Sequence, residues 1–556
     1  MLKFQNFFDL TRFVVLLAIF FVLTGCSNNT TTPAASTSEP EADASTLSDS
    51  SETEKTSDPT SSQSQIGPAG KDLVTVLTHE PLQTLEPYAM VRKQPEASVA
   101  VHIWDTLTRV DDDLTLMPLL AKEWKLVNDK MWQFDLQEGV QFHNGEPFNA
   151  AAAKFSLERA MNLPTSLKAI DINTIIERVE IVDDDTLQVY TVSPQASLPF
   201  LLADIQMLPP VYYSETSEID LLASPVGSGP YQVTNWSLGE PLVLEAYPDY
   251  WQGQPSFSTI IFDSLDQIDE RLAALQSGQA HIVTNLTPDQ QVPLADGGQA
   301  EFVPVESTKR LFIGLRSDPG TPLADPRVRQ ALNYAVDVEA LVADYHAGFG
   351  QRYGNWVLSA DANPALTPIP YDPEKAKALL AEAGFENGFQ TTLDTPEGQY
   401  LNDGQIAQSI AAQLAVVGID VTVQSYDWES YVANRLIPRK TSPMFLLALA
   451  SEGNAIVDTQ NLSFSFPFNP TEWLNADFEE NLRMAQETFN SQQQQRLLHQ
   501  AQTAAYEDSP WIWLWRLYDF YGVDTELDWS PRPDGLIYLY KPVSADDAAT
   551  ADEEVN

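Results

Sequence analysis

The sequence predicts an α/β fold, and three observations support this class. After residue 70, short strand patterns alternate with amphipathic helices. The predicted helices carry recognisable start and stop residues. The chain shows no internal repeat with a period of about 20 to 50 residues, which disfavours solenoids and propellers. The hydrophobic content of 43% is typical of a folded globular body.

Two segments read as strands. Lys71–Leu77 is predicted to be the opening strand, and Ile419–Val423 alternates apolar and polar residues like a half-buried strand. A helix is predicted to start at Asp325, because Asp is a good N-cap and Pro326 suits the first helical position. Its apolar face is formed by Val328, Leu332, Ala335 and Val336.

A second helix is predicted to start in the same way, at Asp372 followed by Pro373. Its predicted buried residues are Ala376, Leu379, Leu380 and Ala383, and Gly384 is expected to end it. Leu272, Leu275 and Gly278 repeat this arrangement.

Length and charge narrow the functional classes. A chain of 556 residues holds two to four domains or one large discontinuous body, at roughly 100 to 200 residues per domain. It carries 31 Lys and Arg against 78 Asp and Glu, a formal net charge of −47. Such an acidic surface repels phosphates, which argues against nucleic acid or an anionic membrane face as the main partner.

Cys26 is the only cysteine, which excludes disulfides within the chain, Cys-based metal sites and any other catalytic thiol. Residues 1–25 look like a signal peptide, and Leu23–Cys26 resembles a bacterial lipobox. The chain is therefore predicted to be anchored to the cell membrane by lipid on Cys26, facing the periplasm or the cell exterior. The alternative is a plain secretory signal with an incidental cysteine.

The two ends of the predicted folded body are polar. Residues 26–70 are rich in Ser, Thr and Pro with scattered acids and have almost no large apolar side chains, so they are predicted to form a disordered tether. Residues 546–556 are predicted to be a disordered acidic tail.

Motifs for catalysis and metal binding are weak. The six histidines are scattered outside any His-Glu-x-x-His spacing, and no Gly-x-Ser-x-Gly sequence occurs, so we expect neither an enzyme, a metal site nor a cofactor. Asp111–Asp113 and Asp183–Asp185 are interpreted as solvated turns, with calcium binding as the alternative. Pro225–Tyr231 is interpreted as a tight turn in which Gly227 and Gly229 adopt unusual backbone angles, with a phosphate cradle as the alternative.

Several blocks in a fixed order carry a family resemblance. They are Trp104–Arg109, Pro118–Trp124, Gly139–Phe148, Phe155–Ala160, Pro225–Tyr231, Asp249–Trp251, Ala274–Gly278, Asp325–Asp337 and Tyr371–Gly384. Together they resemble the family 5 extracellular solute-binding proteins, which serve ABC importers of peptides and nickel. The resemblance covers roughly residues 73–542.

The resemblance implies a periplasmic binding protein fold of type II. Two discontinuous lobes would be joined by two crossover segments, with an extra domain in the first lobe and ligand enclosed when the lobes close. The implied boundaries are 71–110, 223–305 and 520–545 for lobe I, 111–222 for the inserted domain II, and 306–519 for lobe II.

The resemblance also implies the function: a monomeric solute-binding component of an ABC importer that captures peptides of the oligopeptide and dipeptide class and delivers them to the permease. Nickel or haem chelates and oligosaccharides are alternative cargoes for the same fold. A sensor or adhesion lipoprotein without transport is an alternative from a different class.

Candidate ligand residues follow from comparison with dipeptide-binding members. Glu452 stands near the position of an Asp that meets the ligand ammonium, within a loop that here lacks the family's Trp and Pro. The segment Thr395–Tyr400, with Gln399 and Tyr400, lacks the Arg that binds the peptide carboxylate in those members. Arg316, Arg352 and Arg516 are the alternative carboxylate partners.

Aromatic residues are the remaining candidates for the cleft wall. Trp511, Trp513 and Trp515 alternate, so all three are predicted to face one side of a strand. Core packing is the competing interpretation for each, and Trp515 is the preferred ligand residue. Tyr353 and Trp356 follow a glycine-containing loop, and Tyr88 follows the first strand, where family members approach ligand.

Overall fold

The computed structural model describes residues 72–88, 95–163, 166, 172–466 and 469–540. The predicted signal peptide, Cys26, the tether and the acidic tail lie outside these ranges. Within the described residues, no helix combines the length and apolar character needed to span a membrane.

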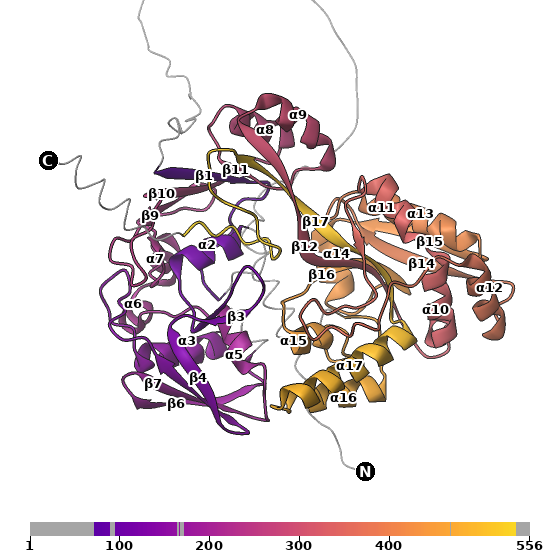
Figure 1. Ribbon diagram of the computed structural model, residues 1–556, viewed down its shortest axis with the longest axis horizontal. Coiled ribbons are helices and arrows are strands. Elements are labelled where there is room, and N and C mark those ends of the chain that lie inside the picture. Colours follow the sequence, from indigo (N-terminus) through magenta and orange to yellow (C-terminus); the bar gives the residue numbers. More distant parts are fainter. Residues whose placement is uncertain (1–71, 89–94, 164–165, 167–171, 467–468, 541–556) are drawn as a thin grey trace, which may run out of the picture. The chain divides into compact units, whose positions relative to one another are not determined.

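A mixed sheet of eleven strands runs through the structure (Figure 1). Its strands follow the order β15-β14-β16-β12-β17-β11-β1-β10-β9-β8, with β13 paired to β17. Their bounds are β1 Leu73–Thr78, β8 Tyr231–Gln232, β9 Leu242–Ala246, β10 Thr259–Ser264, β11 Ile282–Val283, β12 Ala300–Leu315, β13 Gln351–Arg352, β14 Phe389–Pro396, β15 Ile419–Tyr426, β16 Met444–Ala450 and β17 Trp511–Asp524. The α/β prediction is confirmed.

Two long strands connect the two parts of this sheet (Figure 1). β12 and β17 pair antiparallel, first beside β11 and β1 and then beside β16 and β14. Their register shifts between Glu306 and Arg310 and again between Arg310 and Phe312. Irregular pairing of this kind bends and twists a strand pair. The bend lies next to the predicted lobe boundary at residues 305–306, although the boundary itself stays a prediction.

Smaller sheets lie between β1 and β8 in the chain. β4 Ala121–Asn128, β5 Met131–Leu136, β7 Thr186–Thr191 and β6 Ile176–Asp183 form an antiparallel sheet in that order. β2 Thr108–Val110 and β3 Leu116–Pro118 form a hairpin. The turn of this hairpin holds the first aspartate triplet.

Helices surround these sheets (Figure 1). Their bounds are α2 Glu96–Ile103, α3 Ala150–Asn162, α5 Leu198–Leu201, α6 Pro210–Glu215, α7 Glu218–Ala223, α8 Ile268–Gln276, α9 Gln291–Gly297, α10 Pro326–Ala335, α11 Val338–Tyr345, α12 Pro373–Glu382, α13 Asp403–Ala415, α14 Trp428–Tyr431, α15 Ala455–Gln460, α16 Ala476–Gln486 and α17 Ser491–Asp508.

The predicted helix starts are confirmed. The Asp325 side chain accepts a hydrogen bond from the backbone N–H of Arg327, and Asp372 caps α12 through Lys375. All four predicted core residues of α10 are buried. In α12 the prediction is half right, because Ala376 and Leu380 are buried while Leu379 and Ala383 pack only partly against the core.

The expectation that Gly227 and Gly229 adopt unusual backbone angles is wrong. Neither glycine has a positive φ. A Cβ at Gly227 would lie 1.9 Å from the carbonyl oxygen of Ile103, and one at Gly229 would lie 2.6 Å from that of His102. The glycines are therefore required because their backbone packs directly against the end of α2, where a side chain has no room.

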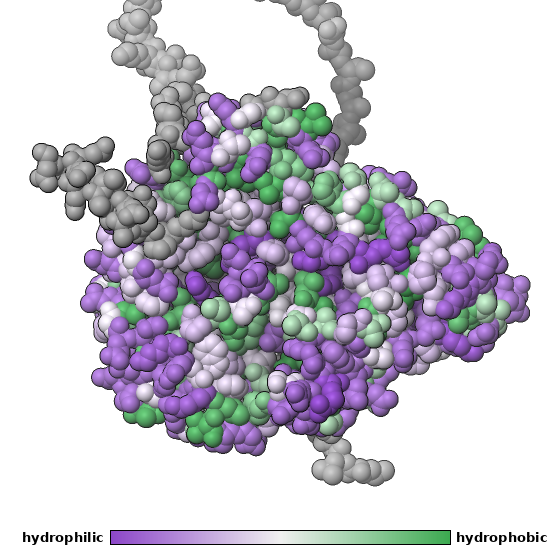
Figure 2. Space-filling view, viewed as in Figure 1, coloured by the Kyte–Doolittle hydropathy of each residue, from purple (hydrophilic) through white to green (hydrophobic). Residues whose placement is uncertain are grey.

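The apolar core is divided into four clusters. The first contains most of the buried apolar residues from β1 to β10, and the second and third contain the two faces of the sheet around β12 and β16. The fourth packs α8 against β11. On the face drawn in Figure 2, hydrophilic residues cover most of the surface and hydrophobic ones form small separate patches.

Candidate functional site

The loop that carries Glu452 lies between a strand and a helix, and we call residues 451–454 the Glu452 loop. It follows β16, and the backbone N–H of Ser451 donates to the carbonyl of Thr308 at 3.0 Å, beside β12. At its other end the Asn454 side chain caps α15 by accepting from Ile456 and Val457. Gly453 has a φ of +81°, a conformation suited to glycine. The loop therefore has a defined path, and Glu452 is partly buried in it.

Asp458, in the first turn of α15, binds this loop. Its side chain is fully buried, and its two carboxylate oxygens accept from the Ser451 hydroxyl at 2.5 Å and from the Glu452 backbone N–H at 2.8 Å. Burial raises the pKa of Asp458 to about 7, against the opposing effects of these two hydrogen bonds and of Arg310.

Arg310, on β12, supplies the positive charge near Asp458. Its side chain is 1% exposed, and it forms no ion pair within 4.0 Å in the described part of the chain. Its Nε has no hydrogen-bond partner, and one terminal nitrogen donates to the Thr308 carbonyl at 3.4 Å. Burial lowers the pKa of Arg310 to about 10, while Asp458 opposes that shift.

Tyr353 and Trp356 enclose the guanidinium of Arg310. The ring centroids lie 5.5 and 5.6 Å from its central carbon, within range of a cation–π interaction. The Tyr353 hydroxyl donates to the Leu311 carbonyl at 2.8 Å, and the Trp356 indole N–H donates to the Asp458 carbonyl at 2.5 Å. Both side chains are buried. The structure thus links three sequence-predicted residues, Glu452, Tyr353 and Trp356, through Asp458 and Arg310.

Gln399 and Tyr400 lie near the strand that leads to the Glu452 loop. The Tyr400 hydroxyl accepts from the backbone N–H of Ala448 on β16 at 2.9 Å. The carboxylate of Asp403 accepts from the N–H groups of Gln399 and Tyr400 at 2.9 and 3.1 Å. Gln399 is exposed and Tyr400 is partly buried. Whether either side chain touches ligand stays a prediction.

Tyr88 lies in a different part of the core. Its side chain is fully buried, and its hydroxyl makes hydrogen bonds to the carbonyls of Ser156 and Gln206 at 3.0 and 2.9 Å. Burial raises the pKa of Tyr88 well above its usual value. Its role in ligand binding stays a prediction.

The prediction that the three tryptophans share one side of β17 is wrong. Trp511 and Trp513 belong to one core cluster, and Trp511 stacks on Phe312 with ring centroids 3.8 Å apart. Trp515 belongs to the cluster on the other face and meets the ring of His346 edge-on at 5.2 Å. The reason is the irregular pairing between Arg310 and Phe312, because one extra residue in β17 reverses the alternation. Trp515 is 0% exposed, and its ligand role stays a prediction.

The three alternative carboxylate partners already have protein partners. Arg316 forms an ion pair with Asp318 at 2.8 Å, Arg352 with Glu339 at 2.8 Å and Arg516 with Glu306 at 2.9 Å. Each also donates to backbone carbonyls.

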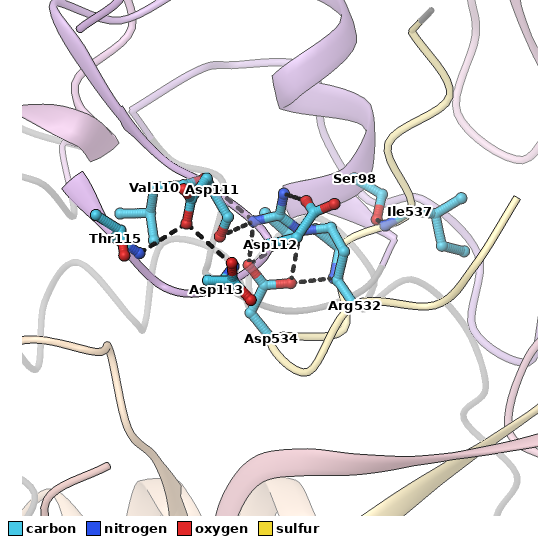
Figure 3. Close-up of polar contacts among 10 residues, drawn as sticks. Ser98, Val110, Asp111, Asp112, Asp113, Thr115, Arg532, Asp534 and Ile537 are labelled. Carbon is cyan, nitrogen blue, oxygen red and sulfur yellow. Dashed lines mark hydrogen bonds and ion pairs between the residues drawn. The ribbon is translucent and has the colours of Figure 1, made fainter. Parts of the chain in front are cut away.

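Opposite the Glu452 loop lies the β2–β3 turn. A Cβ on Gly453 would lie 2.6 Å from the Cβ of Leu114, so the two backbones are in close contact. The Asp111 carboxylate closes this turn by accepting from the N–H groups of Asp113 and Thr115 at 3.0 and 2.8 Å (Figure 3). The interpretation of this triplet as a turn is confirmed, and the described residues contain no cluster of three His, Cys, Asp or Glu suited to a metal.

Arg532, from the segment after β17, binds the same turn (Figure 3). Its guanidinium pairs with Asp112 and with Asp534, the latter at 2.7 Å. It also donates to the carbonyls of Val110 and Asp111, both at 3.1 Å. Both sides of the Leu114–Gly453 contact are thus positioned by buried charged groups.

Sequence reasoning did not identify Arg310 and Asp458. The available signal for Arg310 was a charged residue next to the largely apolar run Leu311–Leu315. Asp458 gave no local signal beyond its place in a helix that follows a loop.

Comparison with known proteins identifies the family. The model of the bacterial extracellular solute-binding proteins, family 5, matches residues 115–470. A glutathione-binding protein, GsiB, from Salmonella typhi is 30% identical over 458 residues, which span 80% of this chain and 88% of that protein. The chain therefore belongs to the family 5 extracellular solute-binding proteins, whose members are binding proteins rather than enzymes, as expected from the sequence.

Solved structures share the fold. HbpA2 from Haemophilus parasuis superposes with a TM-score of 0.74 at 22% identity, covering 84% of this chain and 99% of that one. The periplasmic binding protein DppA from Helicobacter pylori, in complex with the peptide STSA, gives 0.70 at 22% identity, covering 86% and 99%. The predicted type II periplasmic binding protein fold is confirmed.

Proposed function

We propose that this protein is the lipid-anchored solute-binding component of an ABC importer and that it captures short peptides of the size of glutathione. The observation that carries the peptide assignment is the match to GsiB, a glutathione-binding protein, over 88% of that protein's length. The peptide-bound state of DppA, which shares the fold, supports the same class of cargo.

The Glu452 loop supports a role for Glu452 in binding the ligand's ammonium group. The loop path is defined at both ends, so the side chain of Glu452 leaves a rigid support. A charge-assisted hydrogen bond from an ammonium to a carboxylate contributes about 1.5 to 3 kcal/mol. Because Arg316, Arg352 and Arg516 are already paired, we infer that the ligand carboxylate is bound by other donors.

The long strand pair supports capture by closure. β12 and β17 are continuous through the sheet, and their pairing is irregular around residues 306–312. Hinges are short segments that absorb a change in backbone angles, so we assign the hinge to this stretch, between lobe I and lobe II as bounded above. The closed form would then dock on the permease.

The first experiment is native mass spectrometry of the full-length protein, released from detergent before and after mild denaturation. Peptide masses that disappear on denaturation would support the proposal. A single sugar or metal chelate would contradict the peptide assignment while retaining the importer role. If nothing co-purifies and no solute from a library binds, the sensor or adhesion alternative is favoured. Lipid on Cys26 is tested by the mass of the N-terminal peptide, and an unmodified N-terminus contradicts the anchor.

Isothermal titration with reduced glutathione and Ala-Ala tests Glu452. We expect Glu452→Gln to weaken binding about ten- to hundredfold, the range for one charge-assisted hydrogen bond. The matched control is Glu374→Gln, because the Glu374 side chain is 82% exposed and lies on α12. Equal affinities for both variants would contradict the role of Glu452.

A further inference from the structure

We propose that Arg310 and Asp458 are positioning residues, which hold the Glu452 loop in the conformation that binds the ligand's ammonium group. This inference rests on the proposed function, because it concerns the same loop. It names two buried side chains that act through others, since Asp458 bonds to the loop and Arg310 acts on Asp458.

The first step is the geometry of Asp458. Its two oxygens accept from two consecutive residues of the loop, the Ser451 hydroxyl and the Glu452 N–H. The second of these bonds fixes the peptide group from which the Glu452 side chain departs. A carboxylate is a stronger acceptor than a protonated acid, which would have to donate its O–H to the Ser451 hydroxyl and accept from the Glu452 N–H through a neutral carbonyl oxygen. The ionised form of Asp458 therefore holds this loop conformation more strongly than the protonated form.

The second step is the role of Arg310. An arginine buried to this degree is normally paired, yet Arg310 forms no ion pair within 4.0 Å among the described residues, and its Nε has no partner. Its charge therefore acts mainly through the low-dielectric interior, where Asp458 is the acidic group that most strongly affects it. Arg310 thus favours the ionised form of Asp458.

The third step is the surroundings of the pair. Two charged groups act on Asp458: Arg310 on β12 and Glu452 in the loop. The negative charge of Glu452 opposes the ionisation of Asp458. Arg310 faces Tyr353, and the charges of Arg516 and Glu306 affect its pKa less than Asp458 does. Trp356 connects both partners, because its ring lies over Arg310 while its N–H donates to the Asp458 carbonyl. The indole N–H resonance of Trp356 should therefore respond to the ionisation of Asp458.

The binding test compares pH profiles. Full-length protein is titrated with reduced glutathione and with Ala-Ala from pH 5.5 to 8.5. We expect the affinity of the unaltered protein to fall about tenfold between pH 8 and pH 5.5, since the pKa of Asp458 is about 7. Asp458→Asn should bind about tenfold more weakly at pH 8, with a flatter profile. An Asp458→Asn variant with the original affinity and pH dependence overturns the proposal.

The matched control is Asp508→Asn. The Asp508 carboxylate accepts from the indole N–H of Trp473 at 3.0 Å and lies 3.7 Å from a buried arginine, Arg329. It is not bonded to the Glu452 loop. We expect Asp508→Asn to keep the original affinity and pH profile. If both variants lose affinity equally, the effect of Asp458 is one of general stability and the proposal is overturned.

Two variants test whether the positive charge of Arg310 is what supports peptide binding. Arg310→Met should weaken peptide binding about tenfold at pH 7, and Arg310→Lys, which retains the charge, should recover at least half of that loss on a logarithmic scale. Equal losses in both variants overturn the role of the charge.

A test that needs no ligand separates this inference from the proposed function. The indole N–H resonance of Trp356, assigned with Trp356→Phe in protein labelled with ¹⁵N-tryptophan, should shift with a midpoint near pH 7 in the unaltered protein and stay constant in Asp458→Asn. A Trp356 resonance that does not respond to pH overturns the inference. If the resonance responds but neither peptide binds, the titrating pair is supported and the peptide function is contradicted.

Discussion

Arg310 and Arg532 are both buried arginines, but their partners differ. Arg532 is bonded to two carboxylates and two backbone carbonyls around the β2–β3 turn (Figure 3). Arg310 has one long hydrogen bond and two aromatic rings. Burial by itself lowers the pKa of either side chain. In Arg532 the carboxylates outweigh burial and the pKa is raised, whereas in Arg310 burial dominates.

The comparison separates two uses of a buried charge. A guanidinium that donates to several groups joins chain segments, because removing it breaks several hydrogen bonds and ion pairs at once. A guanidinium with unsatisfied donors contributes little bonding, but its field acts strongly on the nearest titratable group. Arg532 therefore mainly stabilises the fold, and Arg310 mainly affects the ionisation of Asp458, which is bonded to the Glu452 loop.

The largest effect is expected for Arg532→Met. Losing the ion pair between the buried guanidinium and Asp534 should cost about 3 kcal/mol of the free energy of unfolding, because Asp534 loses its cation and two backbone carbonyls each lose one donor. Urea denaturation followed by tryptophan fluorescence measures this loss.

The matched variant is Arg310→Met. It should lower the free energy of unfolding by no more than about 2 kcal/mol, since it removes one weak hydrogen bond and two cation–π contacts but replaces a buried charge by an apolar side chain of similar length. Equal losses for both variants would remove the distinction between the two arginines.

The second prediction concerns the loss of stability at low pH through His102, which contacts the segment that carries Arg532. The buried ring of His102 bonds to the Ser98 carbonyl at 2.6 Å and accepts from the Leu539 N–H at 3.0 Å, so the fold favours neutral His102. Burial lowers its pKa from 6.5 to about 4. This stabilisation is complete above pH 6.5 and is lost as the pH falls toward 4, on the order of 3 kcal/mol.

Urea denaturation at a series of pH values measures this loss. In His102→Phe the stability should depend less on pH between 6.5 and 4, because the titrating group is absent. An unchanged slope in that variant would contradict a neutral His102.

The smallest effect is expected for a substitution at Gly453, where the Glu452 loop contacts the β2–β3 turn. In Gly453→Ala the new methyl group would contact Leu114, 2.6 Å from its Cβ and 2.9 Å from its carbonyl oxygen. We expect about tenfold weaker binding of reduced glutathione, measured by titration, because the turn and the Glu452 loop no longer approach fully.

Gly384→Ala is the control, because Gly384 has a similar positive φ but no atom within 4 Å of the added Cβ. The double variant Gly453→Ala with Leu114→Gly should recover part of the affinity, as coupled neighbours do. A loss that Leu114→Gly leaves unchanged would show that backbone strain, rather than the contact, is responsible.

Local signals in the sequence predicted local structure well. Asp325, Asp372 and Gly384 acted as helix boundaries as expected, because capping involves only neighbouring residues. Alternation failed at Trp515, because a bulge in β17 depends on how that strand pairs with β12.

The candidate site likewise contains residues that the sequence indicated and residues that only the packing brings together. Glu452 was chosen through the family resemblance and Tyr353 and Trp356 as aromatic residues after a glycine-containing loop, and the structure links them in one cluster. Arg310 and Asp458 could not be found in this way, because neither belongs to a motif and their shared burial arises only when β12 and α15 pack together.

The sequence by itself determined the α/β class, the family, the helix boundaries and the acidic character of the chain, since each depends on residue types and short spacings. Only the tertiary structure decided which face of β17 holds Trp515, why Gly227 must be glycine, and that the buried Arg310 acts on Asp458. The physical reason is that register, close packing and desolvation are properties of segments brought together by folding.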